Sequence, residues 1–372
     1  MKLIEEARSK KWKTCSYGLG FWGTGNGKRL LEWLELEPDY YCDRNSGVLE
    51  AYPVSIEKKI SICDLLQVKD EMLVFVFLGT EYLQSARQEL QKNSHLHLLS
   101  WQQLVREDEL IRKYFGVGEL THHQKKDDQK YYQVGRKLKS TDRIAIYTCI
   151  TNNYDQLNEP LFIEENCDYY FITDKEGKQR VTESSVYNVM DIDEVIPSGL
   201  SSPKGKNRYC KSHGYEIFKD YKYSIYLDGN IQIVQPIVPL LELMGEVGVA
   251  FHKHPYADDL YEEAMSLSLR ERIAKEEADK TIKWFYDSGM PRFYGMVEGG
   301  VILCDNHNST AKELLDKWFD NYNNGAAKRD QMYIAFSLWE MGIPINAVRV
   351  LPGNWRTNGY FKIMSKHSGY QR

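Results

Sequence analysis

The sequence lacks an apolar run long enough to cross a bilayer, and its start lacks the apolar core of a secretion signal. The longest apolar run spans about residues 72–78 (MLVFVFL), whereas a membrane-spanning helix needs about 20 apolar residues. The first residues, MKLIEEARSKKWK, contain no apolar core. We therefore expect a soluble, cytoplasmic protein, and the sequence leaves peripheral contact with a membrane surface open.

Paired cysteines and an excess of positive charge are also missing. The 7 Cys residues are scattered and none forms a C-x-x-C pair, which is typical of reduced thiols and argues against a zinc site. The 48 Lys and Arg residues are outnumbered by 53 Asp and Glu, which gives a net charge of -5. Nucleic-acid binding, which needs a basic face, is therefore not expected. No G-x-S-x-G elbow is present either, which argues against a hydrolase.

The sequence does contain alternating strand and helix patterns in two stretches. A chain of 372 residues is long enough for two domains. The apolar run at residues 72–78 is typical of a strand that is covered on both faces. Strand–helix alternation predicts an α/β fold with parallel strands. We expect a Rossmann-like parallel sheet at residues 1–120, a polar linker at 121–142 and a second α/β domain at 143–372.

The N-terminal domain has a glycine-rich segment between a predicted strand and a predicted helix. Three glycines alternate with other residues there: Gly23, Gly25 and Gly27. Such glycines allow a tight turn, and the following helix N-terminus favours an anion. Asp43 follows the second predicted strand, where an acid can bind ribose, and Lys28 and Arg29 can add phosphate contacts. The segment predicts nucleotide or nucleotide-sugar binding, and small residues that serve packing alone are the alternative.

A second informative segment is SIYLDGNIQI at residues 224–233. A short apolar strand ends in Asp228-Gly229-Asn230, and another apolar run follows at once. A carboxylate at a strand end, with a second oxygen ligand two residues later, suits a divalent cation. The intervening glycine lets backbone and phosphate approach closely. Asp, Gly and Asn are also turn formers, so an ordinary β-turn is the alternative interpretation.

Further polar residues follow the other strands that we predict in the C-terminal domain. In an α/β domain the base and ribose of a nucleotide bind at the carboxyl ends of the strands. The candidates for these contacts are Thr148, Thr151, Tyr154, Asp155 and Asp174. A predicted helix then places three more polar residues on one face by i, i+3 and i+4 spacing: Asn207, Arg208 and Lys211. We expect its two cations to hold a diphosphate.

The order of these segments resembles a known family. They read TCITNNYD, DYYFITD, KNRYCK, SIYLDGNI, FHKHP, GMVEGGVIL and KRDQ, and they span about residues 143–350. The set is similar to a TOD/MUCI-type glycosyltransferase-like family, formerly a domain of unknown function, whose plant members carry alkaline ceramidase or mucilage-related names. Asp228-Gly229-Asn230 resembles the DxD element of nucleotide-sugar glycosyltransferases, with Asn230 in place of the second acid.

This resemblance implies a GT-A fold for residues 143–372, a nucleotide-sugar donor, a glycan acceptor and Mn²⁺ or Mg²⁺ as the metal. It does not cover residues 1–120, which resemble the Rossmann-like domains found beside sugar-modifying enzymes in bacterial polysaccharide clusters. Gln331 is assigned to the donor site, because the Asp-Gln pair at residues 330–331 gives a more distant likeness to family 8 glycosyltransferases.

Chemistry and resemblance together suggest roles for the remaining candidates. Asp228 is the expected metal ligand, with Asn230 as a weaker amide ligand. His254 is a candidate third ligand or diphosphate contact, and the alternative is a surface or capping histidine. Glu298 and Asp330 are the candidate catalytic carboxylates, because an inverting transferase needs a base near the acceptor hydroxyl. The alternatives are a loop acid at Glu298 and a helix N-terminal acid at Asp330.

We therefore predict a metal-dependent glycosyltransferase that moves a sugar from a nucleotide-diphosphate donor to a glycan or polysaccharide acceptor. The alternative is a non-catalytic module that binds a nucleotide sugar or glycan through the N-terminal glycines, and Asn230 in place of an acid motivates it. The sequence leaves the sugar, the acceptor, the stereochemistry and the oligomeric state open.

Overall fold

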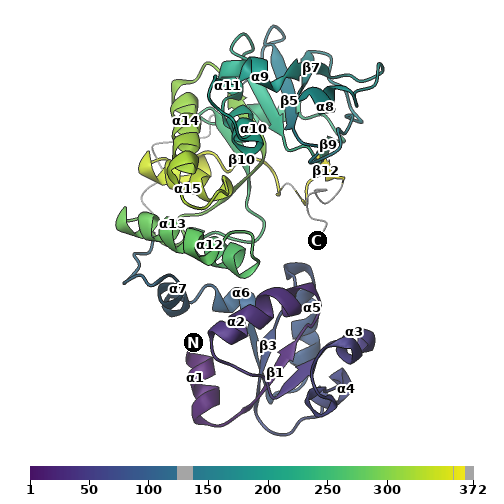
Figure 1. Ribbon diagram of the computed structural model, residues 1–372, viewed down its shortest axis with the longest axis vertical. Coiled ribbons are helices and arrows are strands. Elements are labelled where there is room, and N and C mark those ends of the chain that lie inside the picture. Colours follow the sequence, from purple (N-terminus) through teal and green to yellow (C-terminus); the bar gives the residue numbers. More distant parts are fainter. Residues whose placement is uncertain (124–136, 355, 365–372) are drawn as a thin grey trace. The chain divides into compact units, whose positions relative to one another are not determined.

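The computed structural model describes residues 1–123, 137–354 and 356–364 and divides into two compact units (Figure 1). Unit 1 consists of Met1–Thr121 and Tyr261–Gly289, and unit 2 of His122–Leu260 and Met290–Arg372. The sequence placed residues 261–289 in the C-terminal domain, whereas the structure groups them with the N-terminal one. Most of the predicted linker at 121–142 lies outside the described residues.

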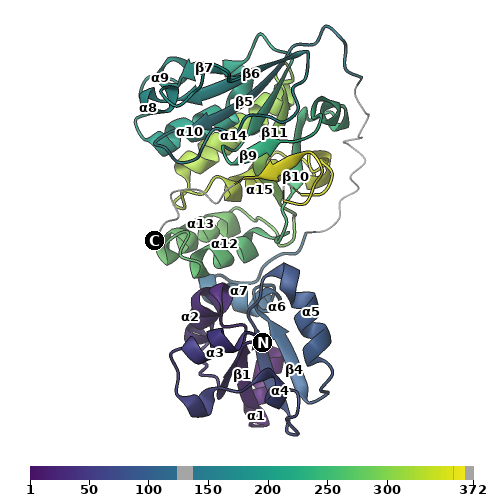
Figure 2. The ribbon, with the colours of Figure 1, turned by 90° about the vertical axis from the view of Figure 1, so that its right-hand side faces the viewer.

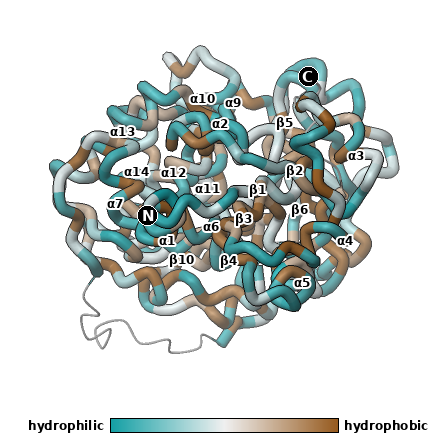
Figure 3. Tube along the Cα trace, turned by 90° about the horizontal axis from the view of Figure 1, so that it is seen from below, coloured by the Kyte–Doolittle hydropathy of each residue, from teal (hydrophilic) through white to brown (hydrophobic). Residues whose placement is uncertain are grey.

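Unit 1 is built on a four-stranded sheet in the order β2-β1-β3-β4, in which every neighbouring pair is parallel. The strands are β1 (Lys13–Tyr17), β2 (Tyr40–Cys42), β3 (Met72–Val76) and β4 (Leu96–Ser100). All residues of β3 are buried, as its apolar sequence predicts, and Figure 3 shows β3 among hydrophobic segments. The predicted Rossmann-like parallel sheet is confirmed.

Helices cover this sheet on both faces. The helices of unit 1 are α1 (Lys2–Ser9), α2 (Lys28–Trp33), α3 (Ser46–Ala51), α4 (Ile62–Leu65), α5 (Thr80–Leu90), α6 (Trp101–Leu104), α7 (Asp108–Phe115), α12 (Leu260–Leu269) and α13 (Lys275–Asp287), and α13 packs against α7. The chain runs from β1 to β2 at one edge of the sheet and from β3 to β4 at the opposite edge. Because both crossovers keep the same hand, α2 and α5 lie on opposite faces (Figure 2).

The segment at 261–289 joins unit 1 through contacts that its sequence does not reveal. The hydroxyl groups of Tyr114 and Ser268 are 2.7 Å apart, and Lys275 Nζ donates to the Tyr114 carbonyl at 2.6 Å. Lys275 also lies over the Tyr114 ring, 4.1 Å from its centre. These contacts link α7 to α12 and α13, which lie far away in the sequence, so chain order alone could not predict them.

The glycine-rich segment differs from its prediction. The strand ends at Tyr17, the loop after it is Gly18 to Gly20, and helical structure begins at residue 21. The stretch Gly23–Gly27 lies inside this helix as the π-helical segment η1. Small residues are needed there for packing, because a Cβ on Gly27 would lie 2.6 Å from the Phe77 ring. The predicted loop at residues 23–27 is therefore wrong.

The two cations that we expected to contact phosphate have other partners. Arg29 pairs with Glu271 at 2.6 Å and donates to the Leu269 carbonyl at 2.6 Å. Lys28 lies 3.8 Å from Glu32, one helical turn further along. Both side chains therefore lie near acidic residues of unit 1 in this structure.

Unit 2 is built on a six-stranded mixed sheet in the order β10-β11-β8-β5-β6-β7. The strands are β5 (Ile144–Ile150), β6 (Cys167–Thr173), β7 (Asn188–Asp191), β8 (Tyr223–Leu227), β10 (Val249–Lys253) and β11 (Val297–Asp305). Parallel pairs join β5 to β6 and β8, and β6 to β7, whereas β11 is antiparallel to β8 and β10. The carboxyl ends of β5, β6, β8 and β10 therefore share one edge with the amino end of β11.

The remaining elements of unit 2 surround this sheet. They are α8 (Lys175–Lys178), α9 (Ile192–Val195), α10 (Pro203–Ser212), α11 (Gly214–Ile217), α14 (Ser309–Asn324), α15 (Gln331–Glu340), the 3-10 helices η4 (Val238–Leu243) and η5 (Ile345–Ala347), and the antiparallel pair β9 (Ile231–Ile233) and β12 (Phe361–Ile363). Ile146, Ile225 and Leu303 form the centre of the core. Across the described residues, no helix has the length and apolar character that spanning a membrane requires.

Candidate active site

The Asp228-Gly229-Asn230 segment is a tight turn at the end of β8. The Ile231 amide donates to the Asp228 carbonyl at 2.9 Å, and the Asp228 amide donates to the Gly300 carbonyl on β11 at 2.8 Å. A Cβ on Gly229 would lie 2.6 Å from Ile150, so this position requires glycine. The β-turn interpretation is therefore correct for the backbone, and the turn fixes Asp228 at the shared edge of the sheet.

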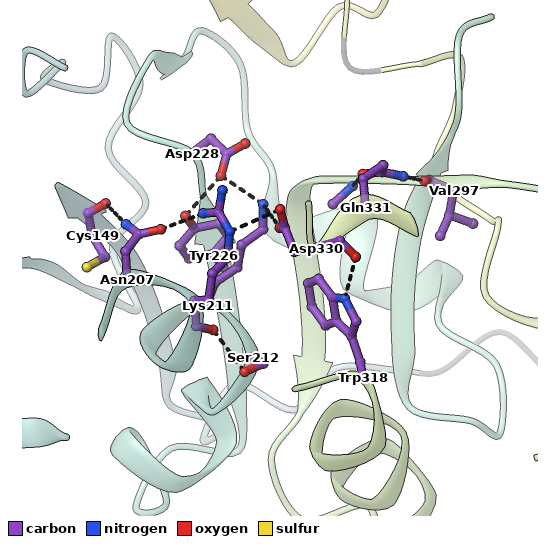
Figure 4. A network of polar contacts seen from close by, with 12 residues as sticks. Cys149, Asn207, Lys211, Ser212, Tyr226, Asp228, Val297, Trp318, Asp330 and Gln331 are labelled. Carbon is purple, nitrogen blue, oxygen red and sulfur yellow. Dashed lines mark hydrogen bonds and ion pairs between the residues drawn. The ribbon is translucent and has the colours of Figure 1, made fainter. Parts of the chain in front are cut away.

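One oxygen of the Asp228 carboxylate is held by two donors. Lys211 Nζ lies 3.0 Å from Oδ1, and the Tyr226 hydroxyl donates to the same atom at 2.9 Å. The other oxygen points away from these donors (Figure 4), and the side chain is 28% exposed. We did not predict Tyr226, although its position two residues before Asp228 places both side chains on one face of the strand.

Lys211 connects Asp228 to a second carboxylate, on Asp330. Lys211 Nζ lies 3.3 Å from Asp330 Oδ2, and Arg208 Nε lies 3.0 Å from Asp330 Oδ1. Lys211 and Asp330 are both buried, and α10, which carries Lys211, packs against α14. We call Arg208, Lys211, Asp228 and Asp330 the charge cluster (Figure 4). It holds two positive and two negative charges.

The charge cluster determines how Asp330 ionises. Burial alone would raise the pKa of the Asp330 carboxyl, but Arg208 and Lys211 outweigh burial and lower it well below its usual range. The pKa of Arg208 is raised, because the facing Asp330 more than offsets the effect of burial. A carboxylate with such a low pKa is a weak base. The geometry therefore favours Asp330 as a residue that positions the two cations.

Asn207 and Gln331 each hold a backbone segment of the site. Asn207 Nδ2 donates to the Cys149 carbonyl at the end of β5 at 2.8 Å, and its Oδ1 accepts from Arg208 at 2.6 Å. Gln331 Oε1 accepts from the Gly299 amide at 3.0 Å, and its Nε2 donates to the Val297 carbonyl. Both predicted donor-site residues thus lie at the shared edge, and their side chains are occupied by backbone contacts.

Glu298 and His254 form a neighbouring pair at the same edge. His254 Nε2 lies 3.4 Å from Glu298 Oε2, and both side chains are largely buried. His254 Nδ1 accepts from the Ala257 amide at 2.9 Å, which assigns the proton to Nε2 on the side of Glu298. In this tautomer His254 has no nitrogen lone pair for a metal. The capping interpretation of His254 describes this geometry better than the predicted metal contact.

The residues after β5 and β6 form a loop pair. Thr148, near the end of β5, and Thr151, directly after it, are buried. Asp155 is buried beside Gly229, and the Tyr154 side chain is 43% exposed. The Asp174 carboxylate accepts from the Asn152 amide at 2.8 Å and caps α8 through the Gly177 amide at 2.9 Å. Asp174 is therefore engaged in holding the loops, and Tyr154 is the exposed aromatic surface among these candidates.

A divalent cation fits this site in part. In the part of the chain that the structure describes, no group of three or more His, Cys, Asp or Glu side chains is arranged to hold a metal ion. Asn230 is 3% exposed, so it is a poorly accessible ligand. Mg²⁺, however, is often bound by one or two carboxylates together with substrate phosphates. The outward oxygen of Asp228 suits such a site.

Residues 125–350, more than half of the chain, match the sequence model of the TOD1/MUCI70 glycosyltransferase-like domain. The chain belongs to this family, as its motifs indicated. No curated protein matches the chain.

Several solved structures show a distant likeness. Mouse xyloside xylosyltransferase 1 is 12% identical, covers 56% of this chain and 85% of its own, and has a TM-score of 0.37. The galactosyltransferase LgtC is 11% identical, with coverages of 52% and 70% and a TM-score of 0.31. The mannosyltransferase Ktr4p of S. cerevisiae is 12% identical, with coverages of 62% and 74% and a TM-score of 0.28.

Proposed function

We propose that this glycosyltransferase is metal-dependent and transfers a sugar from a nucleoside diphosphate donor to a glycan acceptor. The charge balance of the site is the observation that carries the proposal. The charge cluster is neutral by itself, and Glu298 adds a negative charge nearby. A donor diphosphate brings further negative charge that these residues do not neutralise. The site therefore requires an added cation, which the outward oxygen of Asp228 would hold.

The protein's own residues prepare the site for a leaving diphosphate. Transfer breaks the bond between the sugar and the diphosphate, so negative charge grows on the diphosphate oxygen, and stabilising that charge is the main task. A bound metal would supply Lewis-acid stabilisation there. Lys211 is buried and held by two carboxylates, so its ammonium group is already fixed in position. Arg208 is fixed in the same way by Asp330.

We assign contact with the acceptor hydroxyl to the Glu298–His254 pair. Asp330 is too weak a base to take a proton from a hydroxyl at neutral pH, because its pKa is lowered. Glu298 lies on β11, which pairs directly with β8, and Asp228 directly follows β8. Glu298 would accept a hydrogen bond from the acceptor hydroxyl, and the proton on His254 Nε2 would hold the carboxylate in place.

Transfer and hydrolysis assays over a panel of nucleotide sugars test this function. With Mn²⁺ or Mg²⁺ we expect turnover of at least one donor, abolished by a chelator and restored by the metal. Asp228→Asn should lower turnover by about 100-fold or more. Asp193→Asn is the matched control, because the Asp193 side chain is 66% exposed and pairs with Lys206 of α10, which is outside the charge cluster. Absence of turnover for every donor, by protein that is folded, would refute the proposal.

The non-catalytic alternative has one observation in its favour. Asn230 is buried and His254 presents its proton to Glu298, so the protein offers few metal ligands. A binding module of this kind would bind a donor without consuming it. Calorimetry in parallel with the turnover assay separates the two functions, because stoichiometric binding without product would favour the module.

A further inference from the structure

We propose that unit 1 contains a separate binding site for a nucleoside diphosphate, formed by the loop after β1. The structure ends this strand at Tyr17, and the next six residues are Gly18-Leu19-Gly20-Phe21-Trp22-Gly23. They read G-x-G-x-x-G between a parallel strand and a helix, which is the context that a dinucleotide-binding fingerprint requires. This motif begins five residues before Gly23, the first glycine of the segment that the sequence pattern predicted to be the loop.

The three glycines occupy three different environments. Gly18 has φ +88, which places it in the left-handed region of a tight turn. A Cβ on Gly23 would overlap the Gly18 carbonyl, so the helix can pack against the loop only with glycine there. A Cβ on Gly20 would meet no atom within 4 Å, and this residue is exposed. A tight turn, a close backbone approach for pyrophosphate and helix packing are the three roles of such glycines.

The topology of unit 1 places this loop where ligands bind in α/β sheets. In the order β2-β1-β3-β4, the chain leaves β1 toward one side and β3 toward the other. Ligands of open α/β sheets bind at the carboxyl ends of the strands at this kind of switch point. A phosphate beside Gly20 would lie at the start of the helix at residues 21–33, whose first amides have no partner within the helix.

Asp43 supplies the second part of the fingerprint. It follows β2 directly, where an acid binds ribose hydroxyls in such domains. Asp43 Oδ2 accepts from the Leu19 amide at 2.7 Å, so the carboxylate lies against the glycine loop itself. Its Oδ1 accepts from the Asn45 amide at 2.8 Å. Each oxygen of a carboxylate can accept a second hydrogen bond, so capacity for a ribose remains.

A buried polar group provides an independent indication of a ligand. Asn26 lies in the same helix, in the turn after Gly23, and is 3% exposed. Among the residues that the structure describes, its Nδ2 has no hydrogen-bond partner. Buried amide groups are nearly always satisfied, and each exception requires an explanation. A polar ligand bound at this loop, directly or through water, would provide the missing acceptor.

The chemistry of the site identifies a class of ligand. The strand order β2-β1-β3-β4 is that of the flavodoxin-like doubly-wound sheets, which bind a mononucleotide at the switch point between β1 and β3. The site therefore suits a ribonucleoside diphosphate group, either as part of NAD or as part of a nucleotide sugar. Phe21 and Tyr82, which are 72% and 62% exposed, follow β1 and β3 and offer aromatic surface beside this edge.

Calorimetry on the full chain tests the proposal, with ADP, NAD, UDP and a UDP-sugar as probes in the presence of EDTA. Chelation suppresses binding at the proposed metal-dependent site, so the remaining binding reports on unit 1. We expect at least one probe to bind with 1:1 stoichiometry. Preference for ADP and NAD would assign the site to a dinucleotide, and preference for the uridine probes to a nucleotide sugar.

Two glycine variants make the test specific. Gly20→Ala adds a methyl group in open space, so the protein should fold normally and bind the probe about tenfold more weakly or worse. Gly25→Ala is the matched control, because its Cβ also meets no atom within 4 Å, and its affinity should stay unchanged. The proposal fails if no probe binds in EDTA, if both variants bind equally, or if Asp228→Asn abolishes the binding. Turnover by Gly20→Ala is measured separately and tests the proposed function alone.

Discussion

Replacing Lys211 by methionine should both destabilise unit 2 and prevent donor turnover. The Lys211 side chain is 5% exposed, and its Nζ faces Asp228 at 3.0 Å and Asp330 at 3.3 Å. Removing one partner of a buried ion pair costs about 3–5 kcal/mol. Arg208 still faces Asp330 at 3.0 Å in the variant, and Asp228 is partly exposed. Both features lower the cost, so we expect a loss of about 3 kcal/mol.

Urea unfolding at pH 7 measures this loss, and a double variant identifies its cause. Without Lys211, the Asp228 carboxylate lacks its nearest cation. Lys211→Met combined with Asp228→Asn removes one charge of each sign. The double variant should therefore be no less stable than Lys211→Met alone, with a coupling free energy of about 1 kcal/mol or more. Turnover should be lost in both variants.

A different outcome would refute the electrostatic reasoning. If Lys211→Met costs less than about 1 kcal/mol, the two ion pairs contribute no more than exposed ones. If the losses of the single variants simply add in the double variant, Lys211 and Asp228 are not energetically coupled. In either case the charge cluster would not be a fixed, preorganised diphosphate contact.

Three further predictions concern other parts of unit 2. Burial lowers the pKa of His252 to about 4, so the folded protein favours the neutral ring. The free energy of unfolding should therefore be highest above pH 6.5 and should fall by about 3 kcal/mol as the pH falls from 6.5 to 4. His252→Phe should show a weaker pH dependence in urea unfolding, and an unchanged dependence would contradict this cause. Gly229→Ala should lower both stability, measured by thermal unfolding, and turnover, because its Cβ would overlap Ile150. Gly359→Ala, whose Cβ would lie in open space, should change neither quantity. Tyr226→Phe removes one hydrogen bond to Asp228 and should cost about 1 kcal/mol; a double cycle with Asp228→Asn checks this value.

Local sequence patterns predicted the fold well where one element determines its own environment. The apolar run MLVFVFL predicted a buried strand, and β3 is fully buried. The strand before Asp228 and the turn after it were visible in ten residues, because a strand end and its turn formers are adjacent in the chain. Strand–helix alternation predicted both α/β units. The family assignment followed from the order of several such local motifs and is confirmed by the match over residues 125–350.

Residues whose role depends on distant partners were predicted less well. Asp174 was expected to contact the nucleotide, and the structure uses it to hold two loops. His254 was expected to bind metal, and its hydrogen bond with Ala257 instead turns a proton toward Glu298. The helices at 261–289 carry no local signal of the N-terminal unit that they join. The glycine motif was misplaced, because the end of β1 is set by its pairing with β2 and β3.

The sequence by itself determined the strands, the turn at Asp228 and the family, because each depends on residues that are close together in the chain. Tertiary structure alone decided the charge cluster. Lys211, Asp228 and Asp330 are separated by up to 119 residues (330 − 211) in the chain, and they meet because β8, α10 and α15 converge at one edge of the sheet. Ion pairing depends on distances of a few ångströms, and only the packed fold sets those distances.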